Sequence, residues 1–293
     1  MIKLDGNATA KAVKQEIKVE VDQRIEKGQK VPHLAAILVG EDPASQSYVK
    51  SKVKDCEEVG FKSTLVKLDD SISQVELFSN IEKLNNDDDI DGFIVQLPLP
   101  NHIDEAAVTE AIKPEKDVDG FHPYNVGRMV LNKATFLPAT PYGILKLLEH
   151  YNIKTEGKNC LVLGRSNIVG TPMSILLSRM SRIGNATVTL AHSRTQNLEK
   201  LVSEAEIIIA AIGKPEFLKD YEVRDDAVII DVGINRVDDA TRKRGYRLVG
   251  DVKYAEYENK VAALTPVPGG VGPMTRLALL LNTLAAVDMK LNF

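Results

Sequence analysis

The sequence predicts an α/β protein made of two units, each with a parallel sheet covered by helices. Short apolar strands alternate with helical segments over residues 33–97, and a second alternation of the same kind begins after Pro138. In the second series a glycine-containing turn, residues 164–170, joins a buried strand to a helix. A chain of 293 residues is long enough for two domains that each bury a core.

The first series is predicted from its hydrophobic periodicity and its glycine and proline boundaries. Residues 33–40 read HLAAILVG, a short apolar strand that stops at a glycine, and residues 45–60 have helical spacing that also ends at a glycine. The predicted helices are 8–28, 45–60 and 73–85, and the predicted strands are 33–40, 61–68 and 91–97.

The second series resembles the first in its alternation and favours a Rossmann-type unit. Its predicted strands are 160–164, 186–191, 207–212 and 227–232, and its predicted helices are 141–150 and 173–182. A proline- and glycine-rich segment, 265–273, then precedes an apolar closing helix, 274–289. We expect this last helix to pack back on the first domain.

Composition excludes several classes of protein. Lys and Arg number 37 against 41 Asp and Glu, a net charge of -4, which argues against a general affinity for nucleic acid or anionic membranes. The sequence shows neither an apolar run long enough to span a membrane nor the apolar core of a secretion signal, so we expect a cytosolic protein. Cys56 and Cys160 are expected to be buried free thiols, and the five histidines have no metal-ligand spacing, so no metal site is predicted.

The turn after the strand at Cys160 is a candidate phosphate site. Residues 160–172 read CLVLGRSNIVGTP, and Pro172 suits the first turn of a helix. Backbone N–H groups at such a turn point toward the space above the strand and can bind a phosphate. The spacing of Gly164 and Gly170 differs from G-x-G-x-x-G, so an ordinary strand-to-helix turn without a ligand is the competing interpretation.

The next strand favours NADP over NAD. Folds of this type that use NAD usually end their second strand in Asp or Glu, which binds the ribose 2'-hydroxyl. Here the strand ends in Ala191-His192-Ser193-Arg194. Arg165 and Arg194 have the charge to bind a 2'-phosphate. The alternative is that both arginines are only surface charges.

In the first series, Tyr48 and Lys52 are four residues apart and therefore lie on one face of the predicted helix. Lys50 and Lys54 point about 160° and about 120° away from Tyr48 at about 100° per residue. The plain alternative is a lysine on a solvated face beside an ordinary tyrosine. A Tyr-x-x-x-Lys pair also occurs in short-chain dehydrogenases, but there it follows the nucleotide turn, whereas here it precedes Gly164.

Three further segments carry candidate site residues. The third strand ends in Gln96-Leu97-Pro98, which leaves an amide side chain at the edge where parallel strands present ligands. Residues 117–120 read DVDG, a turn with two carboxylates that is structural in most proteins. Residues 265–275 read TPVPGGVGPMT, a loop whose glycines let a flat ligand approach the backbone, with an interdomain hinge as the alternative.

With these segments assembled, the chain resembles the bifunctional methylenetetrahydrofolate dehydrogenase/cyclohydrolase family nearly end to end. The motifs that carry the resemblance are SYVKSK (47–52), VQLPLP (95–100), PEKDVDGFHP (114–123), GRSNIVGTP (164–172), DVGINR (231–236) and TPVPGGVGPMT (265–275). The resemblance implies a folate-binding catalytic domain of residues 1–138 and 274–293, completed by the last helix. It implies a Rossmann NADP-binding domain of residues 139–273, a cleft between the domains, and a homodimer.

The same resemblance implies two reactions in one-carbon folate metabolism, including the supply of purine biosynthesis. The first oxidises 5,10-methylenetetrahydrofolate to the methenyl cation with NADP, and the second hydrolyses the cation to 10-formyltetrahydrofolate. The implied catalytic residues are Lys52, Tyr48, Gln96 and Asp119. The implied folate-binding residues are those four with Leu97, Pro98, Pro268, Gly269 and Gly270, and the implied NADP-binding residues are Gly164, Arg165, Ser166, Ser193, Arg194 and Ile234.

Three positions depart from the family pattern. Ala139 stands where many members have cysteine, Ile212 stands where a small polar residue is frequent, and Lys253-Tyr254 replaces an acidic-aromatic pair. We expect these changes to affect packing and cofactor affinity rather than the reaction. Two other interpretations stay open: a dehydrogenase of the same architecture for a small hydroxy or amino acid, and a dinucleotide-binding module without enzymatic activity.

Overall fold

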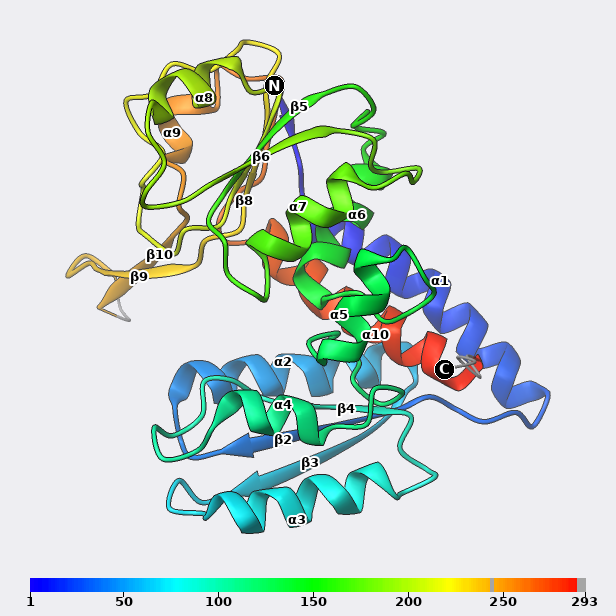
Figure 1. Ribbon diagram of the computed structural model, residues 1–293. Helices are drawn as coiled ribbons and strands as arrows, with labels where there is room; N and C mark the ends of the chain where they lie inside the picture. The colour runs from blue at the N-terminus through cyan, green and yellow to red at the C-terminus, as the bar shows by residue number, and fades with distance from the viewer. Residues whose placement is uncertain (243–244, 289–293) are drawn as a thin grey trace. The chain divides into compact units, whose positions relative to one another are not determined.

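The computed structural model describes residues 1–242 and 245–288, which belong to two compact units. The Lys52 unit contains Lys11–Ala139 and the chain from Arg276 onward, and the Gly164 unit contains Met1–Ala10 and Thr140–Thr275. Two helices, α1 (Gly6–Glu26) and α10 (Val271–Asp288), begin in the Gly164 unit and continue into the Lys52 unit. Both units are α/β, as the sequence predicts (Figure 1).

The Lys52 unit is built on a three-stranded parallel sheet with the order β3-β2-β4. In its register, Ile37 at the centre lies opposite Val66 and Val95. The strands are β2 (His33–Val39), β3 (Lys62–Leu68) and β4 (Gly92–Val95), and the helices between and after them are α2 (Pro43–Val59), α3 (Gln74–Asn85), α4 (Glu105–Ala111) and α5 (Pro123–Val130). α3 and α4 share one core with the sheet, and α2 packs on β2 and β3.

Local sequence fixes the ends of these helices. The Asp42 side chain accepts from Ser45 N before α2, and Gly60 ends α2 in the left-handed region at φ 81°. Ser73 and Glu76 form a capping box at the start of α3. Short sequence signals therefore determine where α2 and α3 begin and where α2 ends.

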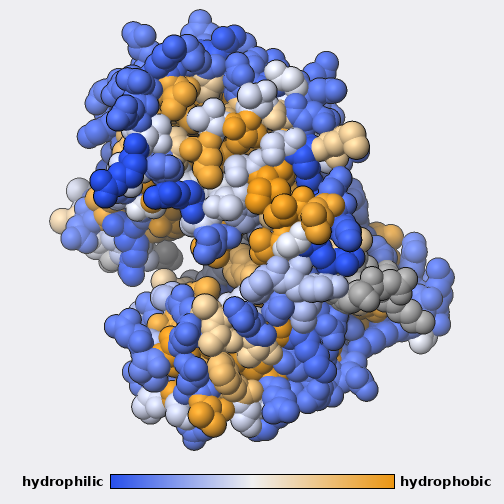
Figure 2. Space-filling view, viewed as in Figure 1, coloured by the Kyte–Doolittle hydropathy of each residue, from blue (hydrophilic) through white to orange (hydrophobic). Residues whose placement is uncertain are grey.

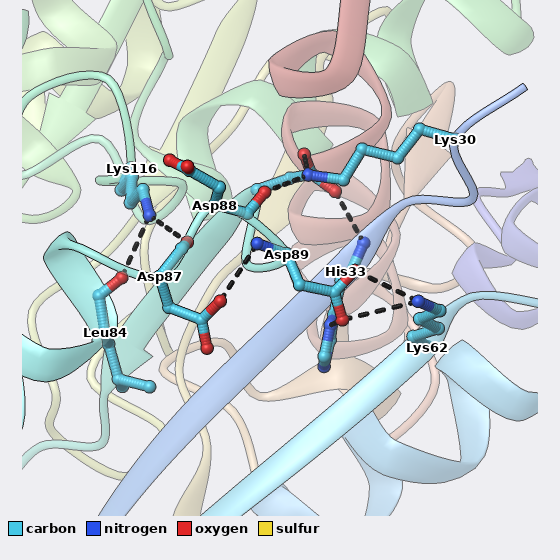
Figure 3. A network of polar contacts seen from close by, with 9 residues as sticks. Lys30, His33, Lys62, Leu84, Asp87, Asp88, Asp89 and Lys116 are labelled. Carbon is cyan, nitrogen blue, oxygen red and sulfur yellow. Dashed lines mark hydrogen bonds and ion pairs between the residues drawn. The ribbon is translucent and has the colours of Figure 1, made fainter.

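A polar network covers the amino edge of this sheet (Figure 3). The His33 backbone N–H donates to an Asp91 carboxylate oxygen at 2.9 Å, and Asp89 contacts both the His33 ring and Lys62 Nζ at 3.0 Å. Lys30 Nζ lies 2.8 Å from Asp91. Because parallel strands share one direction, this network lies at the edge opposite to the carboxyl ends of the strands, and it anchors the sheet away from the candidate site.

The Gly164 unit has a six-stranded parallel sheet with the order β1-β11-β8-β7-β5-β6. The strands are β1 (Ile2–Lys3), β5 (Asn159–Leu163), β6 (Thr187–Ala191), β7 (Ile207–Ala210), β8 (Val228–Asp231) and β11 (Ala263–Leu264). The helices are α6 (Ala139–His150), α7 (Gly170–Ser178), α8 (Leu198–Glu204) and α9 (Tyr254–Tyr257). An antiparallel hairpin, β9 (Asn235–Asp238) and β10 (Tyr246–Val249), extends away from the rest of the unit (Figure 1).

The strand order reverses beside β5, because β6 lies on one side of it and β7 on the other. That reversal is the point where α/β sheets bind their ligands. The core around it is hydrophobic and includes Leu161, Ile208, Ile229 and the buried ring of Tyr257.

The compact units and the predicted division of the chain differ at the first ten residues. Residues 1–138 were expected to belong to the folate domain, but β1 pairs with β11 and adds Met1–Ala10 to the Gly164 unit. A two-residue strand carries too little periodicity to be recognised in sequence. The other two boundaries fall one or two residues from the predicted ones, at Thr140 and Arg276.

The predicted strands and long helices are confirmed with small shifts of their ends. The last helix begins at Val271, three residues before its predicted start, and Met289, its predicted end, lies outside the described residues. The helix predicted over 173–182 is observed as Gly170–Ser178. The sequence interpretation missed several short elements, which are α4, α5, α8, α9, β1, β11 and the β9–β10 hairpin.

The surface seen in Figure 2 is mostly hydrophilic, with hydrophobic side chains in smaller areas. Among residues 1–242 and 245–288, no helix combines the length and the apolar character that crossing a bilayer requires. Cys56 and Cys160 are both free and buried, as expected.

Candidate active site

Lys52 is a buried lysine near the carboxyl end of a strand. Its side chain lies on α2 and the residue is only 6% exposed, whereas Lys50 and Lys54 are exposed. Lys52 Nζ donates to Gln96 Oε1 at 3.1 Å and lies 4.6 Å from the centre of the Tyr48 ring. The structure therefore brings three of the four implied catalytic residues into contact, and the alternative of a lysine on a solvated face is wrong.

Burial changes the chemistry of this amine. Loss of solvent lowers the pKa of Lys52 from 10.5 to about 8. The negative charge of Asp119 raises the pKa again, the positive charge of Arg276 lowers it further, and Cys56 has a smaller raising effect. A substantial fraction of Lys52 is therefore uncharged slightly above neutral pH, and an uncharged amine is a base.

Gln96 is positioned by the end of the sheet. Its backbone N–H donates to Ile37 O and continues the ladder between β4 and β2. Its side-chain Nε2 donates to Leu97 O at 2.7 Å, which leaves Oε1 for Lys52. The peptide bond between Leu97 and Pro98 is cis.

The two carboxylates of the 117–120 turn have different surroundings. Asp117 is 1% exposed and accepts from the N–H groups of Gly120 and His122 and from Asn125 Nδ2. Burial raises the pKa of Asp117 to about 7. Asp117 thus has the structural role that such turns usually have.

Asp119 is partly exposed and interacts with the charge of Lys52. Burial raises the pKa of Asp119, and the Lys52 ammonium lowers it. Gly120 makes the tight turn possible, because it adopts φ +73° and a Cβ there would lie 2.5 Å from the Leu137 carbonyl carbon. The turn thus holds the Asp119 carboxylate on the same side of the unit as Lys52.

A pocket of about 510 Å³ lies at the strand-order reversal of the Gly164 unit. It is formed at the carboxyl ends of β5, β6 and β7, where a dinucleotide fold places its ligand. Its lining residues are Leu163, Gly164, Arg165, Ser166, Ala191, His192, Ser193, Thr195, Leu198, Ala211, Ile212, Lys214 and Phe217.

The unusual glycine spacing has a steric explanation. Gly164 has φ +107°, and a Cβ there would lie 2.0 Å from Ala211 O. A Cβ on Gly170, at the start of α7, would lie 2.0 Å from Gly164 O. Both positions therefore require glycine, one for the turn and one for the close approach of the helix. Ser166 Oγ accepts from the N–H groups of Val169 and Gly170 and fixes the turn.

Four of the six implied cofactor residues line this pocket: Gly164, Arg165, Ser166 and Ser193. Arg194 and Ile234 are exposed and do not belong to its lining. Lys214, Thr195 and Phe217 line it but were not assigned a role from sequence. The sequence could have indicated Lys214 as a pocket residue, because it follows the end of a predicted strand. No sequence pattern indicated Thr195 or Phe217.

Two buried aspartates shape the rim of this pocket. Asp251 accepts from the N–H groups of Ile212 at 2.6 Å and Gly213 at 2.8 Å. Asp231 accepts from the N–H groups of Asp251 and Val252, and burial raises the pKa of Asp231 to about 7. The carboxylate of the DVGINR motif therefore supports loops rather than facing a ligand.

The proline- and glycine-rich loop belongs to the Gly164 unit. Gly269 has φ +105°, and its carbonyl accepts from the Asn7 N–H at 3.1 Å. A Cβ on Gly6 would lie 1.7 Å from Gly270 O, so the start of α1 is packed directly on this loop. The peptide bond before Pro268 is cis. Close backbone packing, rather than a loose hinge, thus sets the shape of Pro268 to Gly270.

These features together define a class of protein. A parallel sheet with a glycine turn and a pocket at its reversal point is typical of a dinucleotide-dependent enzyme, and the buried Lys52 with Gln96 supplies a base. Within the part of the chain that the structure describes, no group of three His, Cys, Asp or Glu side chains is arranged to hold a metal ion.

Comparison with known families agrees with this class. Residues 4–119 match the tetrahydrofolate dehydrogenase/cyclohydrolase catalytic domain, and residues 138–291 match the NAD(P)-binding domain of the same family. The chain therefore belongs to the tetrahydrofolate dehydrogenase/cyclohydrolase family, as the resemblance of its motifs indicated.

Individual relatives are similar over almost their whole length. The chain is 58% identical to the bifunctional protein FolD of Cytophaga hutchinsonii, over 98% of this chain and 99% of that protein. The crystal structure of the bifunctional FolD enzyme of Campylobacter jejuni is 45% identical, with a TM-score of 0.91 over 98% of this chain and 99% of that one. The FolD of Trypanosoma brucei, solved with NADP cofactor and inhibitor, is 35% identical with a TM-score of 0.93 and covers 100% of this chain and 99% of its own.

Proposed function

We propose that this protein oxidises 5,10-methylenetetrahydrofolate to the methenyl cation with NADP and then hydrolyses the cation to 10-formyltetrahydrofolate. The observation that carries the proposal is Lys52, an amine that burial makes partly uncharged and that Gln96 holds in place. A simple dinucleotide-binding module requires no such group.

The oxidation depends on positioning rather than on an acid or a base. NADP, when bound, supplies the hydride acceptor. The residues suited to hold it are Gly164, Arg165, Ser166 and Ser193. Gly164 and Gly170 allow the close backbone packing that forms this turn. The pocket of about 510 Å³ is within the usual size of ligand sites.

The hydrolysis requires a base, because water must add to the methenyl carbon and protons must then move before the ring opens. Uncharged Lys52 takes a proton from that water, and Gln96 Oε1 orients its amine. A bound methenyl cation repels a nearby ammonium and so favours the uncharged amine further. Tyr48 packs on Lys52 and on the pterin.

The folate is recognised by a carboxylate and by backbone. Asp119 accepts from the ring N–H and the amino group of the pterin, two donors that one carboxylate can bind together. The remaining folate contacts are assigned to Leu97, Pro98 and the loop from Pro268 to Gly270.

The preference for NADP rests on Arg165 and Arg194, with Ile234 as an apolar cofactor contact. Arg165 lines the pocket and Arg194 follows the end of β6, where no carboxylate is present to bind a ribose hydroxyl. Measuring NADP and NAD side by side tests this preference, and an Arg165→Ser variant should lose more affinity for NADP than for NAD.

The protein is proposed to act as a cytosolic homodimer. Its two free thiols suit a reducing compartment. Light scattering at several concentrations gives the mass in solution, and a monomer at all of them would overturn the dimer.

One assay separates the three candidate functions. The protein is mixed with NADP and methylenetetrahydrofolate, and methenyl-folate, NADPH and 10-formyltetrahydrofolate are followed together. We expect NADPH to form in step with oxidised folate and the formyl product to accumulate. Binding of NADP without turnover of folate would indicate the module, and turnover of a small hydroxy acid instead would indicate the other dehydrogenase.

A further inference from the structure

Arg276, near the start of α10, is held by a carboxylate from the helix that carries Lys52. Its Nε donates to Asp55 Oδ2 at 2.6 Å, and Asp55 is 7% exposed. Asp55 Oδ1 accepts from Lys14 Nζ at 3.0 Å, so both oxygens of the carboxylate are engaged. The guanidinium is therefore fixed in a partly buried position, with 25% of its side chain exposed.

Asp55 places this cation within electrostatic reach of Lys52. Asp55 follows Lys52 by three residues in α2, so the two side chains are neighbours on one face of the helix. The positive charge of Arg276 acts on Lys52 as a like charge and favours loss of its proton.

The Asp55 carboxylate offsets part of the charge of Arg276, and the other groups around Lys52 favour the ammonium form or are neutral. Asp119 favours the ammonium form, as the thiolate of Cys56 would. Burial raises the pKa of the Cys56 thiol to about 12, so the thiol stays neutral. The remaining neighbours are the Tyr48 ring and the Gln96 amide, while Lys14 and Glu58 pair with each other at 2.6 Å beyond Asp55.

We propose that Arg276, anchored by Asp55, is a positioning residue for the hydrolysis that holds the Lys52 amine in its uncharged, proton-accepting form. Once Asp119 binds the donors of a pterin, less of its charge acts on Lys52, whereas Arg276 keeps its own partner. This inference rests on the proposed function of Lys52, and it concerns a residue that no catalytic motif of the chain contains.

The test is the pH profile of methenyl-folate hydrolysis in charge variants of Arg276. In Arg276→Met, we expect the rising limb to move to higher pH by about half a unit or more, which is about a threefold loss of rate below the limb. Arg276→Gln keeps a donor for Asp55 and should show the same shift with less effect on folding. Arg276→Lys keeps the charge and should leave the limb in its wild-type place.

Two controls separate an electrostatic role from a structural one. Lys18→Met removes the charge of an exposed lysine on α1 that pairs with Asp22, and it should not move the limb. The dehydrogenase rate should be unchanged in the Arg276 variants, because hydride transfer uses no base.

Different results would overturn the role of Arg276 and the role of Lys52. If the Arg276→Gln profile superimposes on the wild type, or if both activities fall equally without a shift, Arg276 has no positioning role even though Lys52 keeps its own. If Lys52→Met still hydrolyses methenyl-folate at the wild-type rate, the proposed function of Lys52 is itself wrong.

Discussion

At the scale of single residues, the site centres on Lys52, whose burial lowers the free energy of unfolding while the amine is charged. A buried ammonium loses hydration, and Lys52 is compensated by one hydrogen bond to Gln96 and by the charge of Asp119. Catalytic groups are commonly held under such destabilising conditions, because the perturbed pKa is what makes them reactive.

This cost predicts a stability effect with a definite sign. The folded-state pKa of Lys52 is about 8 and lies below its ordinary value of 10.5, so between these values the unfolded chain binds more protons. The free energy of unfolding therefore rises with pH in that window. Lys52→Met should remove this dependence and raise the free energy of unfolding near neutral pH by about 2 kcal/mol. Urea denaturation at about pH 7 and about pH 9.5 measures both effects, and a less stable variant at the lower pH would contradict the burial argument.

Substitutions of the two carboxylates of the 117–120 turn should have different effects, one on folate binding and the other on stability. Asp119→Ala should weaken folate binding about tenfold or more while sparing NADP and the fold, because it removes the proposed acceptor of the two pterin donors. Asp117→Ala removes the acceptor of two backbone N–H groups and Asn125, and should lower the free energy of unfolding by about 2–4 kcal/mol. Calorimetry with each ligand and thermal melts measure these effects, and loss of both ligands in Asp119→Ala would mean that this residue is structural too.

Sequence alone could identify the site residues that share a helix or end a strand. Tyr48 and Lys52 were found by their spacing of four, and Gln96 by its place after an apolar strand. Arg276 was not found, because its partner Asp55 is 221 residues away and neither residue has a local signal. The 117–120 turn alone did not rank Asp117 against Asp119. The family resemblance implied Asp119, and in the structure burial and hydrogen-bond partners distinguish the two.

At the scale of elements, the turn from β5 to α7 is determined by backbone proximity. The sequence indicated a phosphate turn but left the spacing of its glycines unexplained. The structure supplies the reason, since Gly164 passes against the backbone of Ala211 and Gly170 against Gly164 itself. Contacts between strands that are distant in sequence cannot be read from a motif.

Gly164→Ala is therefore expected to be severe. A Cβ 2.0 Å from Ala211 O, on a residue at φ +107°, must displace backbone. We expect loss of NADP binding and a fall in the free energy of unfolding of about 2–4 kcal/mol. The matched control is Gly127→Ala on α5, where no atom lies within 4 Å and helix propensity predicts a gain of up to about 1 kcal/mol. Equal NADP affinity in Gly164→Ala and the wild type would contradict the close approach.

At the scale of the whole molecule, the ends of the chain are used in a way that the sequence did not fully reveal. The last helix was expected to complete the folate domain, and the chain from Arg276 onward does belong to the Lys52 unit. The first ten residues group with the Gly164 unit through β1, a two-residue strand with no recognisable periodicity in the sequence. The unit to which such a short segment belongs depends on the strand it pairs with, and that strand is known only from the folded structure.

The last helix also holds the turn that carries Asp119. Asn282 is 3% exposed, and its Nδ2 donates to Val118 O at 2.8 Å and to Leu137 O at 3.0 Å. Asn282→Leu should leave both carbonyls without this donor, lower the free energy of unfolding by about 1–3 kcal/mol and weaken folate binding more than NADP binding. Thermal melts and calorimetry with each ligand check this, and equal weakening of both ligands would show a general loss of folding instead.

The rate of methenyl-folate hydrolysis by Lys52→Met tests most directly whether the Lys52 amine is the base for this reaction. We expect a loss of about a hundredfold or more, with NADP affinity near the wild-type value. Lys54→Met, which changes an exposed lysine of the same helix, should keep full activity. A Lys52→Met protein that hydrolyses methenyl-folate within about threefold of the wild-type rate would contradict the account.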